Sequence, residues 1–183
     1  MALAGLGHSV MTTREPGGAP GAEILRDLLL SGETDWSPMA ETMLHFAARA
    51  EHAARTIAPA LADGTWVICD RFFDSTMAYQ GFGQGADRGV IAALSGMIGL
   101  KPDLTIMLDV SEATAFARQE ARGRTTDRYD RLGAGFHARV AEGFRAIAAA
   151  EPGRCVLIDA NGPAELVAGA VLAAVRQRLE IPA

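Results

Sequence analysis

Apolar residues along the chain gather in four short runs that are rich in strand-forming side chains. The runs span Ser9–Thr13, Thr65–Asp70, Leu104–Val110 and Cys155–Ile158. Longer stretches with helical periodicity lie between them. An alternation of this kind predicts parallel strands joined by crossover helices, which is the α/β class of fold.

A Ser-Pro pair at residues 37–38 is typical of a helix start, so we expect a helix from Pro38 to about Ala62, with a bend at Pro59. Its apolar positions form one stripe, which we expect to face the core. The stripe consists of Met39, Met43, Phe46, Ala47, Ala50, Ala54, Ile57 and Leu61.

Three more helices are indicated in the second half of the chain. Ser111 can cap a helix that stops near Gly123, and another is expected around Phe136–Ala150. The turn at Asn161–Pro163 opens the last helix. Its inner face is expected to carry Leu166, Val167, Ala170, Val171 and Val175.

Composition narrows the class of protein. The 183 residues fit one domain with a full core, and 49% hydrophobic with 21% charged residues is typical of a globular chain. A net charge of −5 argues against a nucleic-acid partner.

Cys69 and Cys155 lie in apolar runs and are expected to be buried thiols in a reducing compartment. Because no run is long enough to span a membrane and residues 1–10 lack the pattern of a signal peptide, we expect a cytoplasmic protein with no membrane partner.

The most informative segment is Thr65–Gly81, TWVICDRFFDSTMAYQG, in which a strand ends on Asp70 and Arg71. In open α/β sheets, ligands bind at the carboxyl ends of the strands. An acid there can hold Mg²⁺ through water, and an arginine can bind phosphoryl oxygens. The alternative is a buried Asp–Arg ion pair that only closes the strand.

A second segment, Thr12–Gly21, reads TTREPGGAPG. Pro16 fixes φ, and the two glycines that follow it allow another group to approach the backbone closely. Arg14 is then free to point at an anion. The alternative is an ordinary connection between a strand and a helix with a solvated arginine.

Together these two segments resemble the bacterial thymidylate kinase (dTMP kinase) family, and the resemblance runs from about Leu3 to the C-terminus. It implies one domain over residues 1–183, a three-layer α/β fold with a parallel sheet of the P-loop nucleoside-monophosphate kinase type. It also implies phosphoryl transfer from ATP to dTMP, giving dTDP for dTTP synthesis, with Mg²⁺ accompanying ATP. The family is commonly dimeric through helices packed side by side, so a homodimer is expected.

The resemblance assigns roles to the residues of both segments. It places Arg14 at the nucleotide phosphates, with Glu15 and Pro16 shaping the acceptor site. It places Arg71 on the acceptor phosphate and Asp70 near Mg²⁺, among the catalytic residues. Around the base and sugar it places Ser75, Thr76, Tyr79 and Gln80. The tyrosine would exclude a ribose 2′-hydroxyl, and a pocket that must hydrogen-bond a polar base discriminates strongly between bases.

The run MLHFAARAEH resembles the family's helix that lines the thymine pocket, with Arg49 at the arginine that contacts the base. The family usually places a stacking phenylalanine four residues earlier, where this chain has His45, with Phe46 beside it. Either ring can be the stacking one, and Phe46 can instead belong to the core. For His52, on the same helical stripe as His45 and Arg49, we expect a solvated face.

An arginine-rich stretch at about residues 118–134 resembles the lid that closes over ATP in the family. Cationic groups brought in by such closure stabilise the transferring phosphoryl group. The candidates are Arg118, Arg122, Arg124 and Arg128. The alternative is the solvated, charged end of a helix.

The family's phosphate-binding loop, G-x-x-x-x-G-K followed by Ser or Thr, does not occur in these 183 residues. We therefore expect a sheet without its first, central strand, showing a gap there or poor stability, and negligible kinase activity for the chain as printed. A start assigned too late, a shortened piece of a longer protein and a true loss are all open. The alternatives for function are a nonenzymatic dTMP-binding remnant and a kinase for another nucleoside monophosphate.

Overall fold

The computed structural model describes residues 2–122 and 128–181. Its strands are β1 (Val10–Arg14), β2 (Trp66–Asp70), β3 (Thr105–Asp109) and β4 (Cys155–Asp159). They coincide with the four runs expected from the sequence to within about two residues at each end. β1 pairs in parallel with β2, and β3 pairs in parallel with β4. The expectation of an α/β fold with parallel strands is confirmed.

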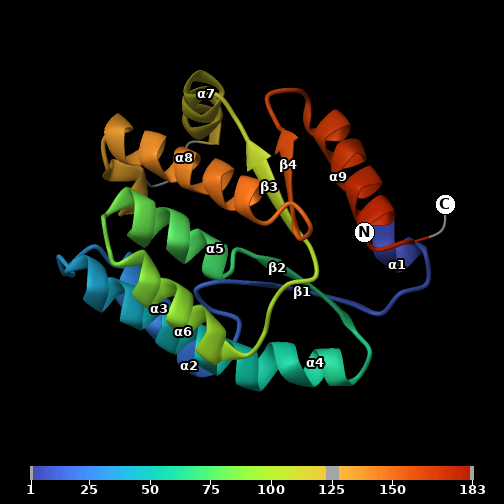
Figure 1. Ribbon diagram of the computed structural model, residues 1–183, viewed down its shortest axis with the longest axis horizontal. Coiled ribbons are helices and arrows are strands. Elements are labelled where there is room, and N and C mark those ends of the chain that lie inside the picture. The colour runs from blue at the N-terminus through green and yellow to red at the C-terminus, as the bar shows by residue number, and fades with distance from the viewer. Residues whose placement is uncertain (1, 123–127, 182–183) are drawn as a thin grey trace.

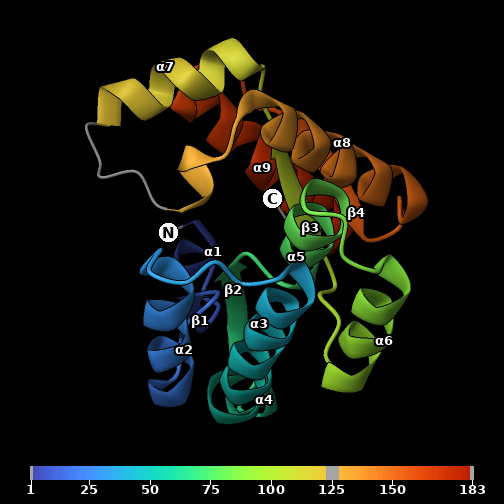
Figure 2. The same cartoon turned by 90° about the vertical axis from the view of Figure 1, so that its left-hand side faces the viewer.

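Within the described residues, the four strands form two separate two-stranded sheets, because no ladder joins β2 to β3. Figures 1 and 2 show the first pair among the helices of one half of the molecule and the second pair among those of the other half. Several apolar side chains on the strands stay open to solvent: Ile68 is 43% exposed, Leu108 56% and Leu157 43%. The two sheets are therefore incompletely covered.

The helices divide between the two halves in the same way (Figures 1 and 2). Around the first strand pair lie α2 (Pro20–Leu30), α3 (Pro38–His52), η1 (Ala53–Ile57), α4 (Ala58–Ala62) and α6 (Arg88–Ile98). Around the second pair lie α7 (Glu112–Arg122), α8 (Ala134–Ala150) and α9 (Ala164–Arg178). Between them lie α5 (Phe73–Thr76) and η2 (Met77–Gly83), and the short elements are α1 (Ala2–Gly5) and η3 (Tyr129–Arg131).

The predicted helix boundaries follow from local chemistry. The side chain of Ser37 accepts a hydrogen bond from the backbone of α3, and Pro38 occupies the first turn. Just before Pro59, which has no backbone N–H to donate, the helix widens into the π-helical turn η1. Ser111 caps α7 by accepting from the N–H of Thr114 at 3.2 Å. Capping signals therefore located these ends correctly.

Two predicted apolar faces are confirmed only in part: Phe46 and Ile57 of the first are buried, and Val167, Val171 and Val175 of the second are half-buried. In the helix from Pro38 to Ala62, Met43 is 47% exposed and Leu61 is 46% exposed, while Glu41 and Arg49 on the other side are at most 2% exposed. These polar side chains lie inside because they pair with groups on other elements, Glu41 with Arg128 and Arg49 with Glu15. In α9 no described residue is buried, and Leu166 is 71% exposed. α9 packs against β4, which belongs to a sheet of two strands.

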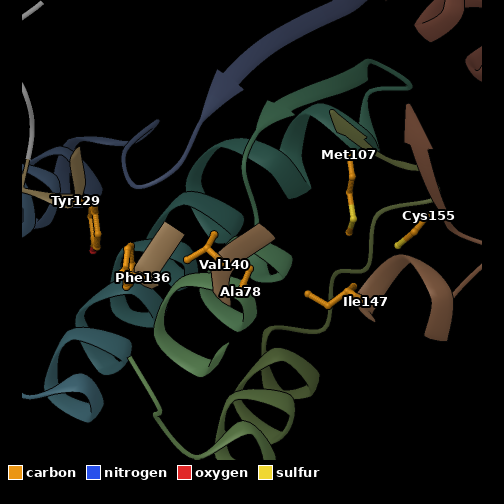
Figure 3. Packing of buried hydrophobic residues seen from close by; sticks show 7 residues of the cluster. All are labelled: Ala78, Met107, Tyr129, Phe136, Val140, Ile147 and Cys155. Atoms are coloured by element: carbon orange, nitrogen blue, oxygen red, sulfur yellow. The ribbon is translucent and has the colours of Figure 1, made fainter. Parts of the chain in front are cut away.

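The largest core cluster joins η2 and α8 to the second sheet (Figure 3). Ala78 packs with residues of α8, and Met107 and Cys155 extend the cluster onto β3 and β4. Tyr129 of η3 closes its other end. Both cysteines are free thiols; Cys155 is buried and Cys69 is half-buried. The cluster fixes η2, which carries pocket residues, against the second half of the molecule.

A buried ion pair makes a second connection between the halves. Arg154, just before β4, donates to both carboxylate oxygens of Asp74 in α5, at 2.7 and 2.8 Å. Both residues are at most 7% exposed, and Arg154 also donates to Thr105 Oγ1 at 2.6 Å. A two-pronged contact of this kind fixes orientation as well as distance. It holds α5 in place.

In the described part of the chain, no helix has the length and apolar character needed to cross a membrane.

Candidate functional site

A pocket opens where the carboxyl ends of β1 and β2 meet α3, α5 and η2. Most of its lining residues are those that the sequence singled out. It is lined by Glu15, Pro16, Leu30, His45, Arg49, Arg71, Phe72, Ser75, Thr76, Tyr79, Gln80 and Tyr129. Two predicted substrate-binding residues, Arg14 and Phe46, do not line it. The fold therefore brings Arg49, Arg71 and Tyr79 to one cavity.

Arg49 is buried at the pocket and held by several contacts. It is 2% exposed, its Nε donates to Glu15 Oε2 at 2.7 Å, and its Nη2 donates to Thr76 Oγ1 at 3.1 Å. The guanidinium lies over the ring of Phe46, 4.6 Å from its centroid. Its Nη1 is buried and has no hydrogen-bond partner among the described residues. A buried donor of this kind is costly unless a ligand completes it.

Phe46 belongs to a core cluster with Ala86 and Ile91. Of the two candidate stacking rings, only His45 faces the pocket. The reason is helical geometry, since adjacent residues on α3 point about 100° apart. Phe46 therefore supports Arg49 from behind.

The expectation for His52 is wrong, because this residue is fully buried. Its Nδ1 lies 3.1 Å from Glu15 Oε1, and its Nε2 lies 2.8 Å from Thr13 Oγ1. Glu15 is thus held between Arg49 and His52. The helical face that looked solvated is the inner one, since its polar side chains find partners on other segments of the chain.

The turn after Glu15 needs glycine at Gly18. Its φ is +84°, and a Cβ there would overlap the His52 ring and lie 2.5 Å from Thr13 Oγ1. We expect Gly18→Ala to lower the free energy of unfolding by about 2–3 kcal/mol, from backbone strain and overpacking. Urea unfolding measures the change. Gly64→Ala is the matched control, because φ is +73° there and nothing lies within 4 Å of the added Cβ; an equal loss in both variants would contradict the role of the close approach.

Arg71 lies at the end of β2 with φ +72°, in the left-handed region that non-glycine residues rarely occupy. Its Nε donates to the carbonyl oxygen of Glu15 at 3.2 Å. Strained backbone of this kind persists where the surrounding structure enforces it and is frequent at binding sites. The strain aims Arg71 at the pocket.

Arg26 of α2 was not singled out by the sequence. Its Nη1 donates to the carbonyl oxygen of Pro16 at 2.6 Å. Burial lowers the pKa of Arg26, and the positive charges of Arg14 and Arg71 lower it further. The carboxylates of Glu23 and Asp27 oppose this lowering, so Arg26 lies in a field of both signs, to which Arg14 and Arg71 contribute the positive part. An arginine in an amphipathic helix is usually solvated, so the sequence carried no signal for it.

Arg14 is not free, contrary to the expectation. It forms an ion pair with Glu23 at 3.1 Å, in which both side chains are largely exposed. Glu23 also accepts from the N–H of Gly18 at 2.8 Å, so it anchors the glycine turn. Exposed pairs contribute little stability. Arg14 can therefore leave Glu23 for a more highly charged anion.

Asp70 is exposed, and its carboxylate makes no hydrogen bond or ion pair with the described residues; its carbonyl accepts from the N–H of Glu15 at 2.9 Å. No group of three or more possible metal ligands occurs among the described residues. Mg²⁺ keeps several waters and is usually held by one or two carboxylates together with substrate phosphates. A single unpaired carboxylate beside a cluster of arginines fits that pattern.

Of the candidate lid arginines, the two whose side chains the structure describes, Arg118 and Arg128, do not line the pocket. Arg118 donates to the carbonyl oxygen of Gly162 at 2.8 Å. Arg128 is paired with Glu41 at 2.7 Å and with Asp35 at 3.6 Å. Arg124 and the side chain of Arg122 lie outside the described residues.

His45 is held by Tyr129, another pocket residue that the sequence did not single out: His45 Nε2 lies 2.9 Å from the Tyr129 hydroxyl. Burial lowers the pKa of His45 to about 3, with Arg49, Arg71 and Arg128 adding to the effect. The imidazole is therefore neutral at physiological pH.

This neutral histidine makes stability depend on pH. Since the folded pKa lies below the unfolded value of about 6.5, only the unfolded chain takes up the proton between these values, so stability is lost as pH falls below about 6.5. We expect His45 to contribute a loss of about 2 kcal/mol between pH 7 and pH 5. Urea unfolding at both pH values should show a smaller loss in His45→Gln; identical profiles would contradict the shift.

Comparison with known proteins decides the family. The thymidylate kinase family model matches residues 1–171 of this chain. The chain belongs to the thymidylate kinase family. The thymidylate kinase of Gluconobacter oxydans is 49% identical, over 98% of this chain and 86% of that protein. The thymidylate kinase of Caulobacter vibrioides is 47% identical, over 97% of this chain and 86% of that protein.

The crystal structure of thymidylate kinase from Ehrlichia chaffeensis superposes with a TM-score of 0.74 at 31% identity. The match covers 96% of this chain and 84% of that one. The expectation of an enzyme of the nucleoside monophosphate kinase class is confirmed by membership of the thymidylate kinase family.

Proposed function

We propose that the pocket binds dTMP as the acceptor of a phosphoryl group from ATP, giving dTDP. The observation that carries the proposal is the buried Nη1 of Arg49, which has no partner among the described residues of a pocket whose other polar groups are satisfied or open. Membership of the thymidylate kinase family supports the same substrate.

At the base end, Arg49 offers a donor and Gln80 offers an amide. Thymine carries a carbonyl at C4 next to N3–H, so one edge of the base presents an acceptor beside a donor. Arg49 would donate to the carbonyl, and the Gln80 side-chain oxygen would accept from N3–H. Thr76 holds Arg49, Ser75 would contact the nucleotide, and Tyr79 would exclude a 2′-hydroxyl.

At the phosphate end, Arg71 and Arg26 would bind the acceptor phosphate, and Arg14 would leave Glu23 to join them. Glu15 and Pro16 shape this end through the carbonyls that hold Arg71 and Arg26. Asp70 would hold Mg²⁺ through water, and the ion supplies neutralisation of phosphate charge when bound. The residues of this chain contribute mainly by positioning the acceptor oxygen.

For the transferring phosphoryl group we propose the arginine-rich stretch at about 118–134. Arg118, Arg122, Arg124 and Arg128 are the candidates, and Arg128 would have to leave Glu41 to take part. Removal of a catalytic arginine of this type costs a thousandfold or more in rate. Single-turnover rates of the four alanine variants would identify it, and four unchanged rates would exclude this role.

Calorimetry tests the acceptor site directly. The 183-residue chain, titrated separately with dTMP and with ATP, is expected to bind dTMP and not ATP, because no G-x-x-x-x-G-K loop occurs among these residues. dUMP, dGMP and dCMP should each bind the pocket more weakly than dTMP, as measured by their competition against dTMP binding. Absence of dTMP binding would refute the proposal, and tighter binding of another monophosphate would favour a kinase for that nucleotide.

Kinase assays test the donor side. The chain as printed is expected to show negligible transfer, and a version to which a strand and a G-x-x-x-x-G-K loop have been added is expected to be active. Equal rates in both would contradict this expectation. If dTMP binds but neither version transfers a phosphoryl group, the nonenzymatic dTMP-binding reading is favoured.

We also propose a homodimer formed through α3, α4 and α6. These helices present an apolar surface around a groove, with Met97 81% exposed and Met43 and Leu61 nearly half exposed. The groove is lined by Ala50, Ala53, Ala54, Ala58, Met97, Ile98, Gly99 and Leu100. Exposed apolar side chains gathered around a groove are a feature of protein–protein interfaces. Met97→Glu should turn a dimer into a monomer in sedimentation equilibrium, whereas a monomeric wild type would refute the proposal.

A further inference from the structure

Glu41 is fully buried, yet it lies outside the lining of the pocket. Its Oε1 accepts from the Tyr129 hydroxyl at 2.7 Å, from Gln80 Nε2 at 2.7 Å and from Gln84 Nε2 at 2.9 Å. Its Oε2 forms an ion pair with Arg128 Nη1 at 2.7 Å. A carboxylate paired with a guanidinium only accepts hydrogen bonds. All groups around Glu41 must therefore turn their donors toward it.

This requirement fixes the protons of two pocket residues. The single hydroxyl proton of Tyr129 goes to Glu41, so His45, whose Nε2 lies 2.9 Å from the same hydroxyl, must donate its own Nε2 proton there. The neutral ring then has an acceptor at Nδ1. Gln80 turns its NH₂ toward Glu41, so its Oε1 points the other way. Neither His45 Nδ1 nor Gln80 Oε1 has a partner among the described residues.

We propose that Glu41 is a positioning residue that sets the hydrogen-bond polarity of the acceptor pocket and thereby its choice between bases. It accepts directly from Gln80 and, through the Tyr129 hydroxyl, orients the donor of His45, and so leaves the acceptors of both residues for the ligand. The inference rests on the proposed binding of dTMP in this pocket, and it adds a residue that does not touch the nucleotide.

The consequence for specificity follows from the chemistry of the bases. Thymine presents a donor at N3, whereas cytosine presents an acceptor there and a donor at its exocyclic amine. An unrestrained glutamine serves either base, because a half-turn of its amide exchanges donor for acceptor. When Glu41 holds its NH₂ group, Gln80 can present only its side-chain oxygen, a hydrogen-bond acceptor, to the base. With cytosine bound, the acceptor N3 would face the acceptor oxygen of Gln80. The exocyclic amine, a donor, would face the donor of Arg49.

The test is Glu41→Gln, which keeps the shape of the side chain but can donate as well as accept. Affinities for dTMP and dCMP are measured by calorimetry, with dCMP competing against dTMP. We expect the preference for dTMP over dCMP to fall at least about tenfold, mainly through weaker dTMP binding. Glu151→Gln is the matched control, since Glu151 pairs with Arg154 and Lys101 away from the pocket. A preference unchanged in Glu41→Gln, or lowered equally in both variants, would overturn the inference.

A second measurement covers the case in which Glu41→Gln does not fold. In the wild-type chain, long-range ¹⁵N NMR should find the His45 proton on Nε2, and Tyr129→Phe should abolish this preference because the accepting hydroxyl is lost. A wild-type proton on Nδ1 would overturn the inference. If the wild type does not bind dTMP at all, the proposed function fails and this inference with it; normal dTMP binding with an unaltered base preference in the variant overturns this inference alone.

Discussion

Arg49→Met is expected to weaken dTMP binding by about a hundredfold or more. The change removes a buried charged donor from the pocket, and hydrogen bonds to charged groups are worth about 1.5–3 kcal/mol each. It also removes the partner of Glu15, which is 3% exposed and would keep only His52 beside its carboxylate. Titration calorimetry measures the affinity, and urea unfolding measures the accompanying loss of stability.

Two further variants separate binding from folding. Arg49→Lys keeps a positive charge beside Glu15, and so limits the loss of stability, but it lacks the forked donors and should still lose most of the affinity. Arg55→Met removes a largely exposed arginine paired with Glu51 and should leave binding unchanged. Full dTMP affinity in Arg49→Met would show that the base is read elsewhere.

Arg154→Met is expected to lower the free energy of unfolding by about 3–5 kcal/mol, because it leaves Asp74 buried without its partner. Since small domains are stable by only about 5–15 kcal/mol, this loss brings the chain close to unfolding at room temperature. Urea unfolding measures the effect as a lower midpoint, with the slope of free energy against urea concentration unchanged. Asp74→Leu combined with Arg154→Met removes both charges and should recover part of the loss.

The control for this prediction is Arg145→Met, which breaks an ion pair of similar geometry with Asp109 at the surface. We expect no measurable change there. A loss in Arg154→Met no larger than that in Arg145→Met would mean that the connection between α5 and β4 carries no stability.

The sequence predicted elements well where local chemistry decides them. The strand ends at Asp70 and the cap at Ser37 follow from residues adjacent in the chain. The site was indicated largely by resemblance, and Arg49, Arg71 and Tyr79 do lie at one pocket. Arg14 lies outside its lining, because Glu23, nine residues later, holds it.

Residues that depend on distant partners could not be found in this way. His52 looked solvated because its partners, Glu15 and Thr13, lie far away in the sequence. Glu41 carries no signal of its own, since a glutamate near a helix start is commonplace. Met43 and Leu61 of the predicted apolar stripe lie outside, because periodicity shows that a helix has two faces, but not how much of each meets the core.

The separation of the strands into two pairs has a consequence for handling this polypeptide. β2 and β3 each leave one row of backbone amides and carbonyls without a neighbouring strand among the described residues. Such rows are templates onto which another molecule's strand can add, and chains with unprotected templates tend to form aggregates as concentration rises. The soluble fraction of the 183-residue chain should therefore fall steeply as its total concentration rises. Short β-forming peptides should compete with this self-association.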